Sequence, residues 1–290
     1  MTMKKPDIAL VTEKAARMGV PTTRGDRTLV WHDEFEDYGN LEKNWKYRTQ
    51  MRSTDAELMT DRKHIDVQDS ELQLHAWRSD KEGIEFTIPQ ALTTYDKMVF
   101  RRGYLEMRCK MPFRHGCWPS FWMLTYEPLM ESKLRSEIDI FEIFSSPDTV
   151  VCNLHKSLRD ADGKIVARCQ LDGKMVSNKR HKIENAENLN NEYHVYGMDW
   201  TQKDITFLID DVPYCTVSLV DNFTDKPGLE AMDCYQDYHF VIFNNFVFTP
   251  GHHWCPEGYR ILPEDPDPID YHIDWIRLYQ RPGEDILVEE

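Results

Sequence analysis

The feature that most limits how this chain can fold is a succession of short segments in which apolar and polar residues alternate. In residues 103–111, every second residue from Leu105 to Met111 is apolar, and polar residues lie between them. Alternation of this kind is the period of a β-strand that buries one face. Further candidate strands cover residues 30–35, 64–67, 71–77, 118–125, 137–144, 150–156, 193–200, 205–209, 214–218, 239–243 and 271–279.

Helical periodicity is rare along the chain. Residues 10–17 fit one or two helical turns that stop at Gly19 and Pro21, and residues 226–234 are a weaker helical candidate. Asp69-Ser70 separates two strand candidates and predicts a hairpin. Because helices do not alternate with the strands, the pattern predicts an all-β sandwich or barrel rather than an α/β fold.

Composition bounds the partners and the domain organisation. The 290 residues carry a formal net charge of −15 without a basic tract, so we expect neither a nucleic acid nor an anionic membrane as partner. No apolar stretch approaches the roughly 18 residues that cross a bilayer. We expect an N-terminal arm over residues 1–27, a single β-sandwich domain over residues 28–290, and a monomer.

The first residues predict where the protein works. Glu13, Lys14 and Arg17 interrupt any apolar run, so the N-terminus does not resemble a signal peptide. This predicts either a cytoplasmic protein or a secreted protein without its signal. Seven cysteines, an odd number without tight spacing, read as scattered reduced thiols.

The most informative stretch is residues 136–144, SEIDIFEIF, where three acids interrupt a run of Ile and Phe. An acid in a buried strand is costly unless it faces a cleft. Alternation places Glu137 and Asp139 on one face, but it sends Glu142 to the other. One extra residue, a β-bulge, restores the parity. We therefore expect a bulged strand with all three acids on one surface.

Acids arranged in this way suit glycoside hydrolysis. A retaining glycosidase needs a nucleophile and an acid/base with carboxyl groups about 5–5.5 Å apart. A third acid between them keeps a proton in the cluster near neutral pH, because like charges repel. A calcium site and a solvated edge strand are the alternatives that fit the same spacing.

The motif Glu137-x-Asp139-x-x-Glu142 resembles the bulged E-x-D-x-x-E signature of glycoside hydrolase family 16. Four other blocks are similar to strands of that family and follow the family order. They are RGYLEMR at residues 102–108, GCWPSFWML at residues 116–124, HVYGMDW at residues 194–200 and IDWIRLY at residues 273–279. The resemblance covers nearly the whole chain, from about residue 30 to residue 280.

The resemblance implies a concanavalin-like β-jelly roll of two antiparallel sheets, with an open glycan cleft on the concave face. It also implies a retaining, endo-acting hydrolase of a β-linked polysaccharide or oligosaccharide, with a β-1,3- or β-1,3/1,4-glucan as first choice. By position, Glu137 is the nucleophile, Glu142 the acid/base and Asp139 the assisting acid. No cofactor is implied for the chemistry.

Four further residues are candidate substrate contacts. Trp118 and Trp122 share a strand face with the acid motif's neighbour strand, and sugars stack on indole rings. His155 matches a His of laminarinase- and galactanase-like members, where it would bond a sugar hydroxyl or the acids. Asn244 matches an Asn that would reach the cleft. Each of these residues is equally compatible with a structural role.

Glu34 and Asp274 match positions that bind a structural calcium on the convex face in many members. Carboxylate oxygens suit such a hard cation. Without a ligand loop, the alternative is a pair of surface acids. A structural calcium is thus the one metal that the sequence suggests.

Two departures from the family weaken laminarin as the substrate. Residues 51–60 lack the N-x-E-x-Q-x-Y-T segment of laminarinase-like members, and residues 246–249 replace an A-V-G-G run. Agarase-, porphyranase- and carrageenase-like members share the bulged motif, so a red-algal galactan is an alternative substrate. Arg114, Lys133 and Arg135 lie near the acids and suit a sulfate. A non-catalytic glycan-binding sandwich is the alternative from a different class.

Overall fold

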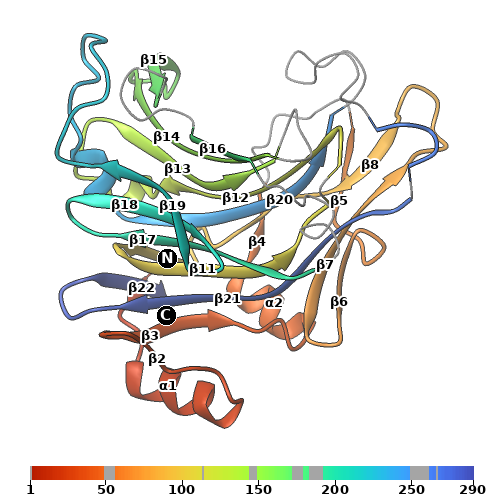
Figure 1. The fold of residues 1–290 in the computed structure, drawn as a ribbon, viewed down its shortest axis with the longest axis horizontal. Coiled ribbons are helices and arrows are strands. Elements are labelled where there is room, and N and C mark those ends of the chain that lie inside the picture. The colour runs from red at the N-terminus through yellow and green to blue at the C-terminus, as the bar shows by residue number, and fades with distance from the viewer. Residues whose placement is uncertain are drawn as a thin grey trace.

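The computed structural model describes residues 2–48, 56–112, 114–143, 149–171, 179–182, 192–248, 261–265 and 267–290. Its strands form two stacked β-sheets, which are the two layers in Figure 1. The upper layer in that view holds the acid strand, and the lower layer packs beneath it. The predicted all-β sandwich is confirmed.

The first sheet carries the acid motif and runs in spatial order from the N-terminal strand to a hairpin edge. Its main path consists of β1 (Met3–Lys4), β22 (Asp285–Glu289), β10 (Met98–Arg101), β20 (His239–Val247), β12 (Cys117–Thr125), β13 (Arg135–Glu142), β14 (Thr149–Arg159) and β15 (Ile165–Gln170). Three short strands join it from the side: β16 (Lys179–Lys182), β4 (Lys46–Tyr47) and β9 (Leu92–Thr93).

The second sheet backs the first. Its main path consists of β19 (Val212–Ser218), β18 (Asp204–Ile209), β17 (His194–Trp200), β11 (Gly103–Lys110), β21 (Ile269–Gln280), β7 (Glu71–Arg78), β8 (Phe86–Pro89) and β5 (Glu57–Met59). Off this path, β2 (Thr23–Arg24) pairs with β3 (Arg27–Asp33), β3 pairs with β21, and β6 (Ile65–Gln68) pairs with β7. Its described pairings are antiparallel except for β5 with β8.

The core lies between the two sheets because each strand buries every second side chain. Phe141 of β13 reaches across to Tyr196 of β17, with ring centroids 4.6 Å apart. Both side chains are fully buried. Their packing anchors the acid strand from behind and leaves its other face to the site. The six cysteines that the structure describes are all free and buried.

Residues 1–27 contact both sheets through β1 and β2, and they contain α1 (Ile8–Arg17). The side chain of Asp7 caps this helix by accepting the backbone N–H of Leu10 at 3.2 Å. Ala15 of α1 packs into a small core with Leu29 and Tyr279. In Figure 1 the helix lies beneath the second sheet, next to β2 and β3. Within the described residues, no helix has the length and apolarity to cross a membrane.

A second short helix, α2 (Tyr38–Asn44), has no counterpart in the sequence-based expectations. The helix predicted over residues 226–234 is wrong. That segment is irregular until the 3-10 helix Asp233–Gln236, because Pro227 and the positive φ of Gly228 (82°) interrupt any helical path. One other short 3-10 helix, Glu127–Leu129, follows β12.

The hairpin predicted around Asp69-Ser70 is confirmed between β6 and β7. Both residues have positive φ, 56° and 58°. Two successive left-handed residues make the tight turn whose twist matches that of the flanking strands.

Candidate active site

The acid motif lies on β13, between β12 and β14, and the strand is bulged as predicted. Asp139 pairs with Asn153 of β14, and Glu142 pairs with Val151. Three steps along β13 thus match two steps along β14, which is the signature of one extra residue. The register to β12 shifts at the same place. Ile138 and Phe141 therefore point into the core, and the three acids share the opposite face.

Glu142 sits at one end of the motif against an indole. Nε1 of Trp118 donates to Oε1 of Glu142 at 2.8 Å. Burial raises the pKa of Glu142 to about 8, the charge of Asp139 raises it further, and the Trp118 hydrogen bond opposes both. An indole N–H only donates, so Oε1 accepts and the proton of the neutral acid resides on Oε2. At neutral pH, Glu142 is a protonated acid with a fixed orientation.

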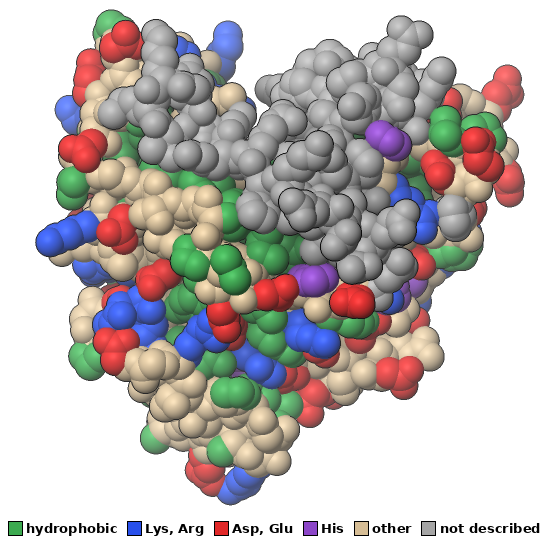
Figure 2. Space-filling view, in the orientation of Figure 1, with side chains coloured by type: hydrophobic (Ala, Val, Ile, Leu, Met, Phe, Trp, Pro, Cys, Tyr) green, Lys and Arg blue, Asp and Glu red, His purple; other side chains and the backbone are tan. Residues whose placement is uncertain are grey.

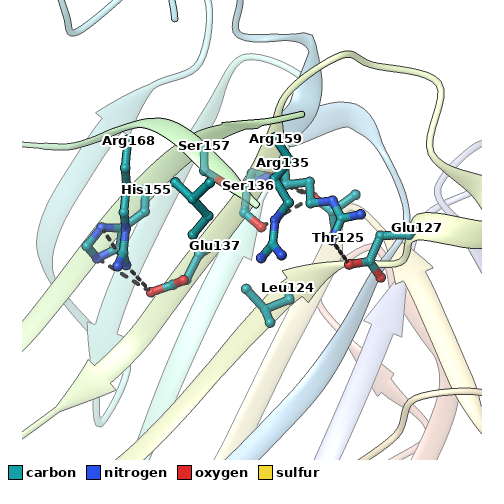
Figure 3. Close-up of a pocket in the computed structure, with 11 residues that line it drawn as sticks. Leu124, Thr125, Glu127, Arg135, Ser136, Glu137, His155, Ser157, Arg159 and Arg168 are labelled. Carbon is teal, nitrogen blue, oxygen red and sulfur yellow. Dashed lines mark hydrogen bonds and ion pairs between the residues drawn. The ribbon is translucent and has the colours of Figure 1, made fainter. Parts of the chain in front are cut away.

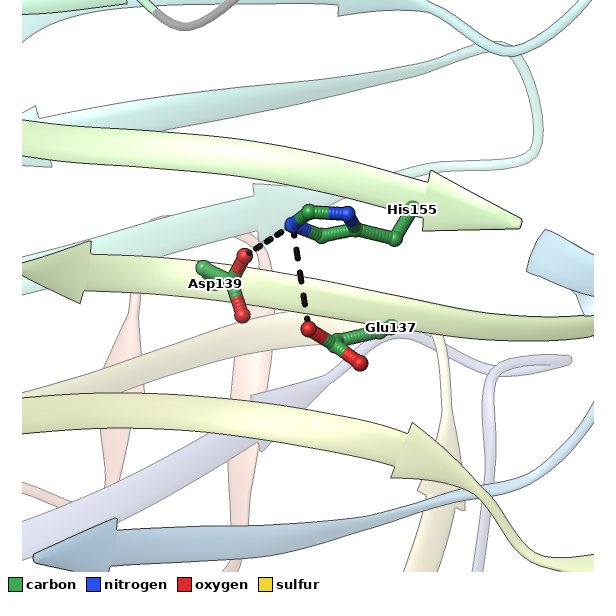
Figure 4. Close-up of side chains that lie close together, drawn as sticks. All are labelled: Glu137, Asp139 and His155. Carbon is green, nitrogen blue, oxygen red and sulfur yellow. Dashed lines mark ion pairs between the residues drawn. The ribbon is translucent and has the colours of Figure 1, made fainter. Parts of the chain in front are cut away.

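Asp139 occupies the middle of the motif and is only 1% exposed. Burial raises the pKa of Asp139 well above its usual range, and the charge of Glu137 adds to the effect. Nε2 of His155, on β14, lies 3.1 Å from Oδ2 of Asp139 and 3.7 Å from Oε1 of Glu137. Figure 4 shows the imidazole above both carboxyls. The predicted contact between His155 and the acids is present.

Glu137 sits at the other end of the motif and has a cationic partner. Nη2 of Arg168, on β15, donates to Oε1 of Glu137 at 3.0 Å and lies 3.2 Å from Nδ1 of His155. Figure 3 shows Arg168 and His155 meeting Glu137 from one side. A guanidinium is the natural counter-ion of an ionised carboxylate. The motif thus has a buried, protonated end at Glu142 and an ion-paired end at Glu137.

Three of these side chains also meet the geometry of a metal site. Glu137, Asp139 and His155 have ligand atoms within 4.8 Å of one another, the one such group among the residues described. The guanidinium of Arg168, 3.0 Å from Glu137, already supplies a positive charge there. Electrostatics favour the arginine rather than an additional cation.

Trp122 and Asn244 form a second polar unit beside the acids. Oδ1 of Asn244 accepts from Nε1 of Trp122 at 3.0 Å and from the hydroxyl of Ser120 at 2.8 Å. The Arg48 guanidinium lies over the Trp122 ring, 4.8 Å from its centroid. Asn244 is buried and Trp122 partly exposed. Asn244 thus fixes the indole of Trp122, and this indole remains open to a ligand.

Trp118 is held differently. Phe248 stacks on the indole of Trp118 with centroids 5.1 Å apart and an interplanar angle of 13°, and Phe246 packs against its edge. Phe246 and Phe248 belong to the run that departs from the family pattern. That departure therefore gives the Glu142 partner a tight aromatic support. One face of the indole is occupied by Phe248, which leaves the other face for a sugar.

Comparison with known proteins identifies the family. The model of glycosyl hydrolases family 16 matches residues 52–235, more than half of the chain. The chain belongs to glycosyl hydrolase family 16. A glucan endo-1,3-beta-glucosidase of Cryptopygus antarcticus is 26% identical over 232 residues, 76% of this chain and 80% of that relative. A beta-glucanase of Rhodothermus marinus is 25% identical and aligns over 87% of this chain and 85% of that relative.

The fold of this family 16 chain matches solved structures. The laminarinase catalytic domain from Thermotoga maritima superposes with a TM-score of 0.67 at 21% identity, covering 89% of this chain and all of that chain. The expected concanavalin-like β-jelly roll is therefore confirmed. At this identity the likeness speaks for the fold alone.

The calcium prediction for this family 16 chain is not tested by the structure, which shows the two acids in ion pairs. Glu34 accepts from Nε and Nη2 of Arg277 at 2.9 and 2.7 Å. Asp274 pairs with a different arginine, Arg108. A calcium ion at this face would have to compete with both guanidinium groups.

The sequence did not reveal all the residues that surround the acids. Arg168 and Arg48 belong to no family motif quoted above, and β15 carries no alternation that marks it as a strand. Arg168 reaches Glu137 only because β15 pairs with β14, which in turn pairs with the acid strand. Of the three basic residues suggested for a sulfate, Arg135 pairs with Glu127 at the rim of the pocket beside Glu137.

Proposed function

We propose that this chain is a retaining, endo-acting hydrolase of a β-linked glucan with β-1,3 or mixed β-1,3/1,4 linkages. The observation that carries the proposal is the asymmetry of the acid motif. Glu142 has a pKa raised to about 8, whereas Glu137 has Arg168 as counter-ion on the same strand face. Two carboxyls held in different charge states are what a general acid and a nucleophile require.

In the first step, the ionised Glu137 attacks the anomeric carbon and forms a covalent glycosyl ester. The bond from that carbon to the leaving oxygen breaks, and Glu142 gives its proton to this oxygen. Because Trp118 holds Oε1 of Glu142, the proton is delivered from Oε2. Asp139 and His155 surround the nucleophile and position it.

In the second step, water attacks the same carbon and the ester bond to Glu137 breaks. Glu142, now ionised, takes a proton from the water and returns to its starting state. Trp122 and the open face of Trp118 provide apolar surface on which sugar rings stack. Asn244 and His155 are the polar groups proposed to bind sugar hydroxyls.

The names of the relatives support a glucan as the substrate class. The Cryptopygus antarcticus relative is described as a glucan endo-1,3-beta-glucosidase, and the Rhodothermus marinus relative as a beta-glucanase. A reducing-end assay over laminarin, mixed-linkage glucan, agarose, porphyran and carrageenan tests the proposal. We expect cleavage of laminarin, of mixed-linkage glucan or of both. Cleavage of galactans alone would contradict it, and binding without any cleavage would indicate a glycan-binding sandwich.

The Trp118–Glu142 hydrogen bond makes a prediction for pH dependence. Activity needs a protonated Glu142, so it falls as pH rises through the pKa of that acid. Removing the indole N–H with Trp118→Phe takes away an interaction that lowers this pKa. We expect the alkaline limb of kcat/KM to move to higher pH. Trp122→Phe, which loses a bond to Asn244 instead, should leave the limb in place. An unmoved limb in Trp118→Phe would contradict the assignment.

A further inference from the structure

A pocket continues the row of acids beyond Glu137. It has an empty volume of about 410 Å³ and lies where β12, β13, β14 and β15 run side by side. Three arginines, Arg135, Arg159 and Arg168, line it together with Glu127 and Glu137. Figure 3 shows these five side chains around the pocket.

Two of the arginines are already paired. Arg135 forms an ion pair with Glu127, and Arg168 pairs with Glu137 at 3.0 Å. Arg159 donates to the carbonyl oxygen of Gly163 at 3.0 Å, and no carboxylate pairs with it among the residues described. Burial lowers the pKa of Arg159, and the charges of Arg135 and Arg168 lower it further. The third arginine is thus crowded by like charge.

A fourth guanidinium lies within reach of the same charges. Arg48 stacks on Trp122, and its Nη1 is buried without a hydrogen-bond partner in the described part of the chain. Burial lowers the pKa of Arg48, whereas the charges of Glu137 and Glu127 raise it. An arginine with a buried, unpartnered N–H beside a cleft is ready to donate to a ligand.

The local charge opposes that of the whole molecule. Four arginines (48, 135, 159 and 168) against Glu127 and Glu137 give 4 − 2 = +2, in a chain whose total is −15. Asp139 and Glu142 do not cancel this excess, because burial raises the pKa of both. Two arginines suffice as counter-ions for the two acids, so the other two need a different explanation.

We propose that this arginine pocket binds an oxyanionic substituent, a sulfate ester or a carboxylate, carried by the sugar ring that sits beside Glu137. Guanidinium groups pair with such oxygens through two parallel N–H donors, whereas a neutral hydroxyl gains little from a doubly positive pocket. The inference rests on the proposed glucan hydrolase function and narrows its substrate to an acidic, substituted glucan. Arg159 and Arg48 are the proposed contacts.

Matched substrates test this inference. The probes are laminarin, laminarin sulfate and carboxymethyl β-1,3-glucan of low substitution, with kcat/KM measured at one ionic strength. We expect Arg159→Gln and Arg48→Gln to lower kcat/KM on the preferred anionic probe by roughly tenfold more than on laminarin, the loss typical of one charged hydrogen bond. Lys164→Gln, an exposed cation on the same hairpin, should leave the ratio unchanged. The preferred probe distinguishes sulfate from carboxylate.

The outcomes separate the inference from the function. If laminarin is cleaved but neither arginine variant changes the anionic-to-neutral ratio, the anion site is refuted and the hydrolase stands. If no glucan is cleaved, the proposed function fails, and calorimetric titration of Glu142→Gln with sulfated and neutral laminarin oligosaccharides tests the pocket alone. Tighter binding of the sulfated probe that is lost with Arg159→Gln supports the pocket, and equal binding of the two probes overturns it.

Discussion

Replacing Glu137 with glutamine is expected to lower turnover of the preferred glucan by on the order of 10⁴-fold or more, because the variant has no nucleophile to form the glycosyl ester. Glu142→Gln is expected to lower it by about 10²–10⁴-fold, the usual contribution of a proton donor. Initial rates at saturating substrate measure both losses. Both side chains keep their size, so circular dichroism should show an unchanged fold.

The leaving group separates the two roles. An aryl β-glucoside oligomer with an acidic phenol leaves without protonation, so it should restore the first step in Glu142→Gln. Glu137→Gln should gain nothing from the same substrate. Glu131→Gln removes an exposed acid outside the cluster and should keep full activity. Activity close to that of the parent protein in either motif variant would refute the assignment of that residue.

The free energy of unfolding is expected to fall as pH rises from about 5 to about 8. Glu142 has a folded pKa of about 8 against an ordinary value of 4.5, so the folded state holds a proton that the unfolded state releases over this window. When the folded state binds more protons, stability decreases with rising pH. Glu106 contributes with the same sign, because burial raises its pKa to about 7. Urea titrations at several pH values measure the slope.

Glu142→Gln isolates the contribution of the acid/base to this slope. Glutamine cannot ionise, so the variant should lose at least about 2 kcal/mol less stability than the parent protein across the window, at about 1.4 kcal/mol per unit of pKa shift. Glu131→Gln should keep the parent slope. A slope in Glu142→Gln equal to that of the parent protein would mean that Glu142 is not held neutral by the fold.

The strand face of each acid was predictable because parity is a local property. Three acids in an Ile- and Phe-rich run left two choices, a misplaced Glu142 or a bulge, and a buried unpaired acid is too costly for the first. The structure has the bulge between Asp139 and Glu142. The hairpin at Asp69-Ser70 was predictable for the same reason, since turn chemistry lies in adjacent residues.

The cationic side of the site was not predictable, because it depends on which strands become neighbours. Arg168 meets Glu137 only after β15 pairs with β14, and Arg48 meets Trp122 from a segment far away in the sequence. The helix expected over residues 226–234 failed because a short apolar period outweighed Pro227 and Gly228 in the reading. Irregular loops follow such residues rather than any periodicity.

Covalent trapping tests the central claim, the nucleophilic role of Glu137, most directly. A 2-deoxy-2-fluoro-β-laminaribiosyl fluoride reacts through the first step and slows the second, so the glycosyl ester accumulates and can be mapped by mass spectrometry of peptides. The expected result is one added disaccharide mass on the peptide that contains residues 136–143, with fragmentation placing it on Glu137. An adduct on Glu142 or on any residue outside the motif would contradict the account.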